Sequence, residues 1–189
     1  GTTEVAVLSL GGTVLSEYVR VAGDEINDSI ATYLKKVHNL VVGERTAEEI
    51  KIKIGSAFPS NEFDLQSIDV RGLHLLSGLP RSINLKAGDL REAMSEPLNK
   101  IVDAVKRTLE RTPPELAADI VDRGIMLAGG GALVRGISDL LSHETGIFTH
   151  VAEDPLLCVV NGCGLVLDDF KSMRRVLDTP DFARNVIRD

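Results

Sequence analysis

Three consecutive glycines are the strongest indication of a ligand site in this sequence. Gly129, Gly130 and Gly131 follow the apolar run 125–128 and precede a helical pattern. Because glycine lacks a Cβ atom, the backbone can approach a ligand closely and present N–H groups to a phosphate or a sugar edge. A glycine-rich turn can also exist only to pack a helix against a strand, and the spacing matches neither a P-loop nor a Rossmann fingerprint. The pattern alone leaves both interpretations open.

Two further groups of residues could contact a nucleotide. Gly1, Thr2 and Thr3 offer backbone donors and two hydroxyls suited to a terminal phosphate, although an ordinary hairpin end would look the same. Glu48 and Lys51 lie three residues apart on one face of an expected helix. Their side chains could hydrogen-bond a ribose, but an exposed ion pair worth about 0.2–0.5 kcal/mol is the simpler interpretation.

The composition narrows the class of protein. The chain of 189 residues has a formal net charge of −7 and a pI near 5.1, which argues against a nucleic-acid-binding face. No apolar run has the length of a membrane-spanning helix. The two cysteines, Cys158 and Cys163, form no disulfide framework, and we expect two buried thiols on a packed helix in a reducing cytoplasm. No catalytic triad or metal-ligand spacing is present in the sequence.

Hydrophobic periodicity and turn residues predict the elements that must position these groups. The expected strands are residues 4–10, 13–21, 65–74, 80–86, 125–128 and 147–151. The expected helices are residues 25–38, 46–55, 89–95, 96–112, 113–122, a helix that ends near 145, and 155–168. This alternation predicts an α/β domain with a mixed sheet flanked by helices. The stretch 24–88 has helices and a strand pair of its own, which indicates a small inserted α+β subdomain.

Several element ends carry a specific signal. Gly11-Gly12 predicts a tight hairpin turn, because both glycines tolerate a positive φ. Helix caps are expected at Asp24, at Thr46 with Glu49, at Thr112 with Glu115, at Gly146 and at Asp154. Glu96-Pro97 is expected to begin a new helix, and 125–128 to be a buried central strand. The first strand follows Gly1-Thr2-Thr3-Glu4 directly with no initiator methionine, so we expect a chain that begins partway through a longer protein.

Five segments of the sequence resemble the actin superfamily, and the MreB family of bacterial actins closely. The segments are 1–7, 43–51, 113–120, 124–133 and 152–156, in the family's order. The resemblance implies the second half of an actin-like ATPase with a ribonuclease H-like fold. In that fold 1–23 and 89–157 would form the large subdomain, and 24–88 the inserted small subdomain. Residues 158–189 would form a C-terminal helix and tail that pack on the absent first half.

The resemblance also implies ATP with Mg²⁺ as the ligand. The implied contacts are Gly1 and Thr2 in the second phosphate loop, Glu48, Glu49 and Lys51 at the ribose and base, and Gly129, Gly130, Gly131 and Ala132 in the adenosine motif. By the same resemblance, the first phosphate loop and the glutamate that orients the attacking water lie outside this chain. We therefore expect no catalytic or metal-binding residue here and no hydrolysis by this chain alone. Ala128 differs from the threonine that often precedes the three glycines, a small change on an expected buried strand.

The resemblance implies a function for the intact protein. Members of the family bind and hydrolyse ATP, polymerise into filaments at the inner face of the cell membrane, and determine rod shape by guiding peptidoglycan synthesis. The implied partners are other protomers, a membrane-anchored elongation partner such as RodZ, and the inner membrane through the absent half, but no nucleic acid. A sugar kinase or a chaperone ATPase would share the fold. Those proteins need a substrate pocket or a C-terminal peptide-binding domain, which we do not expect here.

Overall fold

The computed structural model describes residues 1–171 and 173, and its first element is an antiparallel hairpin. Strand β1 (Thr3–Ser9) pairs with β2 (Gly12–Val19). The expected Gly11-Gly12 turn is wrong by one position, because the two turn residues with positive φ are Leu10 (49°) and Gly11 (76°). A bulge between Val7 and Leu8 shifts the register, so that Ser9 pairs with Gly12.

Two helices follow, and both begin earlier than their cap signals predicted. They are α1 (Gly23–His38) and α2 (Glu44–Ile54), with the short strand β3 (Leu40–Val41) between them. Asp24 is not the N-cap of α1, since the Ala22 N–H donates to the Glu25 carboxylate at 2.7 Å and starts the helix before Asp24. The Thr46 capping box is also wrong, because α2 begins after Gly43 and has no side-chain cap.

The second sheet contains the strand pair that the sequence predicted. A one-turn helix η1 (Phe63–Leu65) leads into β4 (Ser67–His74), which pairs with β5 (Pro80–Lys86) in an antiparallel hairpin. Strand β3 adds to the other edge of β4 in the order β3-β4-β5. Buried Val70 and Leu85 face the helices, as the alternating pattern requires.

Helix α3 (Ala87–Glu110) is a single helix, so the predicted break at Glu96-Pro97 is wrong. A proline inside a helix leaves the carbonyl four residues earlier without its usual donor. Here that carbonyl, of Ala93, accepts a hydrogen bond from the Ser29 hydroxyl of α1 at 2.5 Å. The helix continues through Pro97 because a neighbouring helix supplies the donor that the backbone lacks.

The last third of the described chain forms a parallel strand pair with helices around it. Its elements are α4 (Pro114–Arg123), β6 (Ile125–Leu127), η2 (Gly130–Leu133), α5 (Ile137–Thr145), β7 (Thr149–Val151) and α6 (Cys158–Asp168). Strands β6 and β7 are parallel and connected through α5. Gly146 ends α5 with a φ of 71°, as predicted.

Three expectations for this region are wrong. Thr112 does not cap α4 but donates to the Thr108 carbonyl at 2.8 Å, because Pro113 occupies the cap position. Strand β6 is not fully buried, since Met126 is 66% exposed. Helix α6 begins three residues after Pro155, because a turn closed by the Leu157 N–H and the Asp154 carbonyl precedes it.

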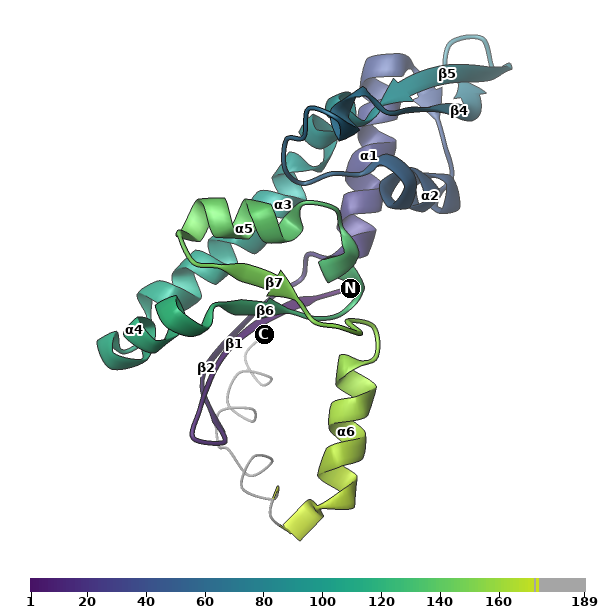
Figure 1. Cartoon of the computed structure of the whole chain (residues 1–189). Helices are drawn as coiled ribbons and strands as arrows, with labels where there is room; N and C mark the ends of the chain where they lie inside the picture. The colour runs from purple at the N-terminus through teal and green to yellow at the C-terminus, as the bar shows by residue number, and fades with distance from the viewer. Residues whose placement is uncertain (172, 174–189) are drawn as a thin grey trace, which may run out of the picture.

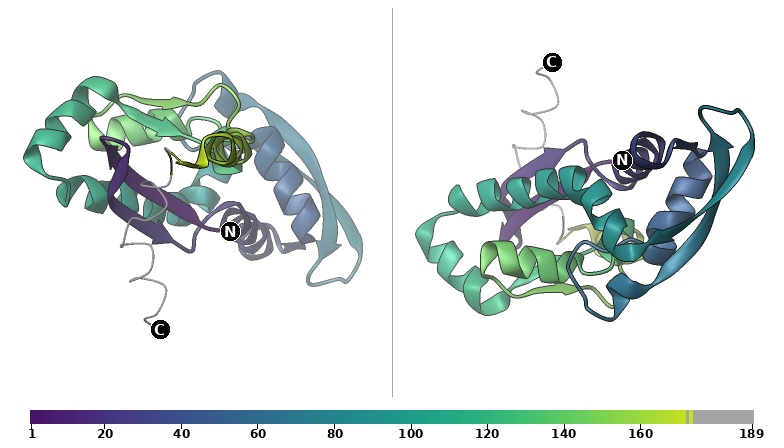
Figure 2. Two further views of the ribbon diagram at one scale, coloured as in Figure 1. Left: turned by 90° about the horizontal axis from the view of Figure 1, so that it is seen from below. Right: turned by 90° about the horizontal axis from the view of Figure 1, so that it is seen from above.

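The main core lies where α1, α2 and α3 pack together against the β3–β5 sheet and α5. Ile26, Ile30 and Leu34 of α1 are 0–2% exposed there. Figures 1 and 2 show an elongated arrangement in which the β4–β5 hairpin lies at one end and α4 at the other, with α3 running between them. Helix α3 therefore connects the two ends of the molecule.

Helix α6 projects away from the β6–β7 pair (Figure 1). Its large apolar side chains are exposed, among them Val159 (71%) and Leu167 (74%). The expectation of two buried cysteines is wrong, since Cys158 is half-buried and Cys163 is exposed. In residues 1–171 and 173, no helix combines the length and apolarity needed to cross a membrane.

Candidate functional site

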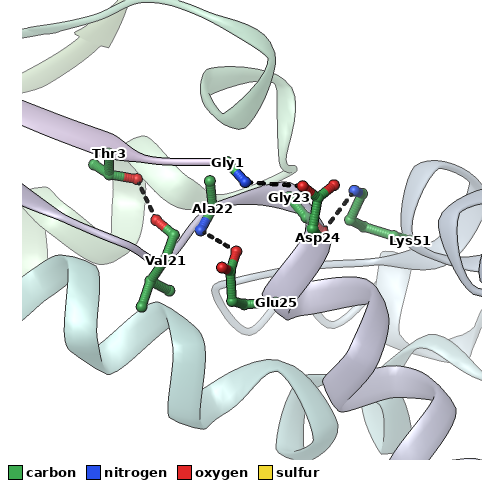
Figure 3. Close-up of polar contacts among 8 residues, drawn as sticks. All are labelled: Gly1, Thr3, Val21, Ala22, Gly23, Asp24, Glu25 and Lys51. Atoms are coloured by element: carbon green, nitrogen blue, oxygen red, sulfur yellow. Dashed lines mark hydrogen bonds and ion pairs between the residues drawn. The ribbon is translucent and has the colours of Figure 1, made fainter.

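The start of α1 brings together residues from three separate segments (Figure 3). The Lys51 ammonium, from the last turn of α2, donates to the Gly23 carbonyl at 3.1 Å. The Gly1 nitrogen lies 2.8 Å from the Asp24 carboxylate. Two of the predicted site residues, Gly1 and Lys51, therefore flank the same helix N-terminus, at opposite ends of this polar cluster.

Hydrogen bonds fix the backbone of this cluster. The Thr3 hydroxyl donates to the Val21 carbonyl at 2.7 Å, which ties the start of β1 to the chain that leaves β2. The backbone N–H of Ala22 lowers the pKa of the Glu25 carboxyl that accepts from it. Glu25 is thus held in the charged form beside the helix start.

The three predicted residues of α2 have different environments. Glu48 and Glu49 are exposed, whereas Lys51 is half-buried. Glu49 forms ion pairs along its own helix, at 3.4 Å to Arg45 and 3.8 Å to Lys53. The simpler alternative for Glu48 and Lys51, an ion pair between them, does not form, because Lys51 is bound to the Gly23 carbonyl instead. Glu48 has no ion-pair partner among the described residues.

The three glycines differ from one another in the structure. Gly129 has a φ of 83° and donates its N–H to the Pro155 carbonyl at 2.7 Å, which sets the turn after β6. A Cβ atom on Gly130 would lie 3.6 Å from the Leu156 side chain, an ordinary contact, while no atom lies within 4 Å of the Cβ positions of Gly129 and Gly131. Ala132, the last predicted residue, is buried at 7% exposure. Open space therefore borders both Gly129 and Gly131.

The N–H groups of this turn are available as donors. Within the part of the chain that the structure describes, neither Gly130 nor Gly131 donates its N–H to a backbone or side-chain acceptor. Both begin the one-turn helix η2, where the first N–H groups have no partner inside the turn. Free donors beside open space can bind a polar or anionic group of a ligand.

One connection links the glycine turn to α2. Residues Ser56 and Arg135 form a parallel β-bridge, and the Ala57 N–H donates to the Arg135 carbonyl at 2.7 Å. The Arg135 guanidinium stacks on the ring of Phe63 at 3.6 Å from its centroid. Ser56 and Ala57 directly follow α2, and Arg135 lies shortly after η2. These contacts therefore connect the helix that carries Lys51 to the turn that carries Gly131.

Sequence reasoning missed the residues of the Ser56–Arg135 connection. Arg135 has no periodic or motif signal. The glycine next to it, Gly136, was a local sequence sign of a close approach, and in the structure it has a φ of 73° and a Cβ position 3.0 Å from Phe58.

A cavity of about 260 Å³ lies elsewhere, between α3, α5 and residues 57–59, and none of the nine predicted site residues lines it. No group of three or more His, Cys, Asp or Glu residues is arranged for a metal ion in the described chain.

The fold and the glycine turn define the class of protein. A β hairpin, a helical insertion with its own sheet, and a parallel β6–β7 pair around α5 superimpose on MreB5 of Spiroplasma citri bound to AMPPNP. That match has a TM-score of 0.86 and 35% identity, over 91% of this chain and 51% of the other. A structure of MreB5 bound to ADP matches equally well, with a TM-score of 0.86 and 34% identity over 95% and 53%. The fold is thus an actin-like α/β fold, as predicted.

The family follows from the sequence comparisons. The model of the MreB/Mbl protein family matches residues 1–175, and the chain belongs to this family. The cell shape-determining protein MreB of Escherichia coli (strain K12) is 50% identical over 168 residues, which is 89% of this chain and 48% of that protein. The cell shape-determining protein Mbl of Bacillus subtilis (strain 168) is 44% identical over 173 residues, or 92% and 51%. The chain spans about half the length of these relatives.

Proposed function

We propose that this chain provides the adenosine side of an ATP-binding cleft in an MreB-like bacterial actin. The observation that carries the proposal is the match to MreB5, a family member at 35% identity whose structures hold AMPPNP and ADP. The free N–H groups of Gly130 and Gly131, and the open space beside Gly131, are suited to the nucleotide. Buried Ala132 would support the turn from behind.

We assign separate roles to the remaining predicted residues. Lys51 presents an ammonium beside the α1 N-terminus, where it can reach a ribose hydroxyl or a phosphate. Glu48 and Glu49 offer carboxylates to the ribose, although Glu49 must first release Arg45 and Lys53. Gly1 and Thr2 are exposed and would contact the phosphates. Mg²⁺ would bind mainly through the nucleotide phosphates, since that ion keeps few protein ligands.

We further propose that the chain supplies only part of the catalytic apparatus. The first phosphate loop and the catalytic glutamate of the family are expected outside this chain, so this chain alone should not hydrolyse ATP. The proposed domains are 1–23 with 89–157, the insertion 24–88, and 158–189. The exposed apolar side chains of α6 support packing of the last segment against the other half of the protein, because such a surface is unfavourable in water. Residues 172 and 174–189 of that segment lie outside the described residues.

For the intact protein we propose the family's cellular role. It would hydrolyse ATP, polymerise into filaments on the inner face of the cell membrane, and guide peptidoglycan synthesis and rod shape. Its partners would be other protomers, a membrane-anchored elongation partner such as RodZ, and the inner membrane through the other half. Membership in a family of cell shape-determining proteins supports this proposal.

Nucleotide binding by the intact protein tests the site. Titration with a fluorescent ATP analogue should give saturable binding that Gly130→Val and Lys51→Met weaken by about tenfold or more. Lys35→Met is the matched control, because Lys35 is an exposed lysine in the last turn of α1 and is not among the proposed site residues. If the intact protein binds no ATP, or if the two site variants bind like the wild type, the assignment is wrong.

A further inference from the structure

The adenosine side of the proposed cleft is built from two separate parts of the chain. Helix α2 carries Lys51, and the glycine turn carries Gly130 and Gly131, whose N–H groups have no acceptor in the described part of the chain. Lys51 does not tie α2 to this turn, because its ammonium is bound to the Gly23 carbonyl of α1 at 3.1 Å. A ligand that contacts both parts therefore depends on other residues to set the distance between them.

Short hydrogen-bonded segments lead from both parts of the site to the Ser56–Arg135 connection. At the end of α2, the residue that caps the helix donates its N–H to the Lys51 carbonyl at 2.9 Å, and Ser56 comes next in the chain. After the glycine turn, the Val134 N–H donates to the Gly131 carbonyl at 3.2 Å, and Arg135 comes next. A shift at the connection therefore moves the backbone of both parts.

Side-chain packing holds the connection in place. Ser56 and Ala57 are buried, and the Ala57 N–H donates to the Arg135 carbonyl at 2.7 Å. Arg135 is an exposed residue, yet its guanidinium lies 3.6 Å from the centroid of the Phe63 ring. Phe63 is buried and belongs to the main core. Because a cation is attracted to an aromatic face, this stack anchors Arg135 to the core of the insertion 24–88.

Gly136 allows the two backbones of the connection to come close together. Its φ is 73°, and a Cβ atom there would lie 3.0 Å from both the backbone nitrogen and the Cβ atom of Phe58. Phe58 is held in turn, since its carbonyl accepts a hydrogen bond from the Ser56 hydroxyl at 2.8 Å. A side chain at position 136 would therefore push the segment after α2 away from Arg135.

We propose that Arg135 and Gly136 are positioning residues for nucleotide binding. Through the Ser56–Arg135 connection they set the distance between Lys51 on α2 and the N–H donors of the glycine turn. This inference rests on the proposed function and names the residues that keep the two parts of its site in register. Their effect should be largest for a ligand that contacts both parts, because only such a ligand is sensitive to the distance between them.

Displacement of a fluorescent ATP analogue from the intact protein, by ATP and by 2′,3′-dideoxy-ATP, tests this role. The dideoxy compound lacks the ribose hydroxyls assigned to α2, so its binding should depend little on the position of α2. Arg135→Ala and Gly136→Ala should each weaken ATP binding by about three- to tenfold and dideoxy-ATP binding by less than about twofold. The preference for ATP should therefore fall. Because a partly unfolded population lowers both affinities alike, the ratio of the two affinities separates positioning from loss of the fold.

Arg123→Ala is the matched control, since Arg123 is an exposed arginine of α4 outside both parts of the site, and it should bind both ligands like the wild type. If the wild type prefers ATP and both variants keep that preference, the positioning role is wrong and the proposed function stands. If Arg135→Ala weakens both ligands equally and Gly136→Ala weakens neither, Arg135 contacts the phosphates directly and the positioning role is wrong. If the wild type binds no ATP, the proposed function is wrong and this inference falls with it.

Discussion

The three glycines after β6 should respond differently to the same substitution. Gly129 has a φ of 83°, so Gly129→Ala places a side chain in the left-handed region and should cost about 1–2 kcal/mol. For a chain of this size that loss lowers Tm by about 2–8 °C. Gly131 lacks a positive φ and has nothing within 4 Å of its Cβ position. Gly131→Ala should therefore change the free energy of unfolding by less than about 0.5 kcal/mol.

Gly131→Ala should instead affect nucleotide binding. A methyl group at Gly131 would enter the space proposed for the nucleotide and should weaken ATP binding by about tenfold or more. The assays are thermal unfolding by circular dichroism without nucleotide, and titration of the intact protein with a fluorescent ATP analogue. Equal Tm losses for Gly129→Ala and Gly131→Ala would refute the reasoning from φ. Unchanged ATP affinity in Gly131→Ala would refute the placement of the ligand.

Three other perturbations test the fold. Gly124→Ala should cost about 2–4 kcal/mol by chemical denaturation, because φ is +81° and its Cβ would lie 2.5 Å from the Phe148 carbonyl oxygen; a loss below about 1 kcal/mol would contradict this. Leu34→Ala, at 0% exposure, should cost about 2–5 kcal/mol, with exposed Val37→Ala of the same helix as its control. The lowered pKa of Glu25 means that its bond to Ala22 stabilises the fold above the unfolded carboxyl pKa and that this stability is lost as the pH falls through the folded value. Glu25→Gln should therefore cost about 0.5–1 kcal/mol at neutral pH and approach wild-type stability below about pH 4; a difference that does not change with pH would contradict the assignment.

Much of the fold followed from local patterns. The β4–β5 pair and the end of α5 were predicted, because alternation and the glycine at 146 depend only on neighbouring residues. The continuous α3 was not predictable in this way, since the donor to its Ala93 carbonyl is Ser29, 64 residues away. Helix starts were also misplaced, because the nearest good cap residue is not always the one the packed helix uses.

The candidate site, like the fold, was predicted in part from the sequence and decided in part by tertiary contacts. The sequence by itself determined the family, the actin-like fold and the candidate glycines, because identity spread over five segments does not depend on any one contact. Only the tertiary structure decided that Lys51 is bound at the start of α1, and that the Gly129 N–H is used by the Pro155 carbonyl whereas the Gly131 N–H is free. It also supplied Arg135, whose bridge to Ser56 joins α2 to the glycine turn. These contacts join residues far apart in sequence, and side-chain reach and backbone φ at such contacts are set by packing rather than by local preference.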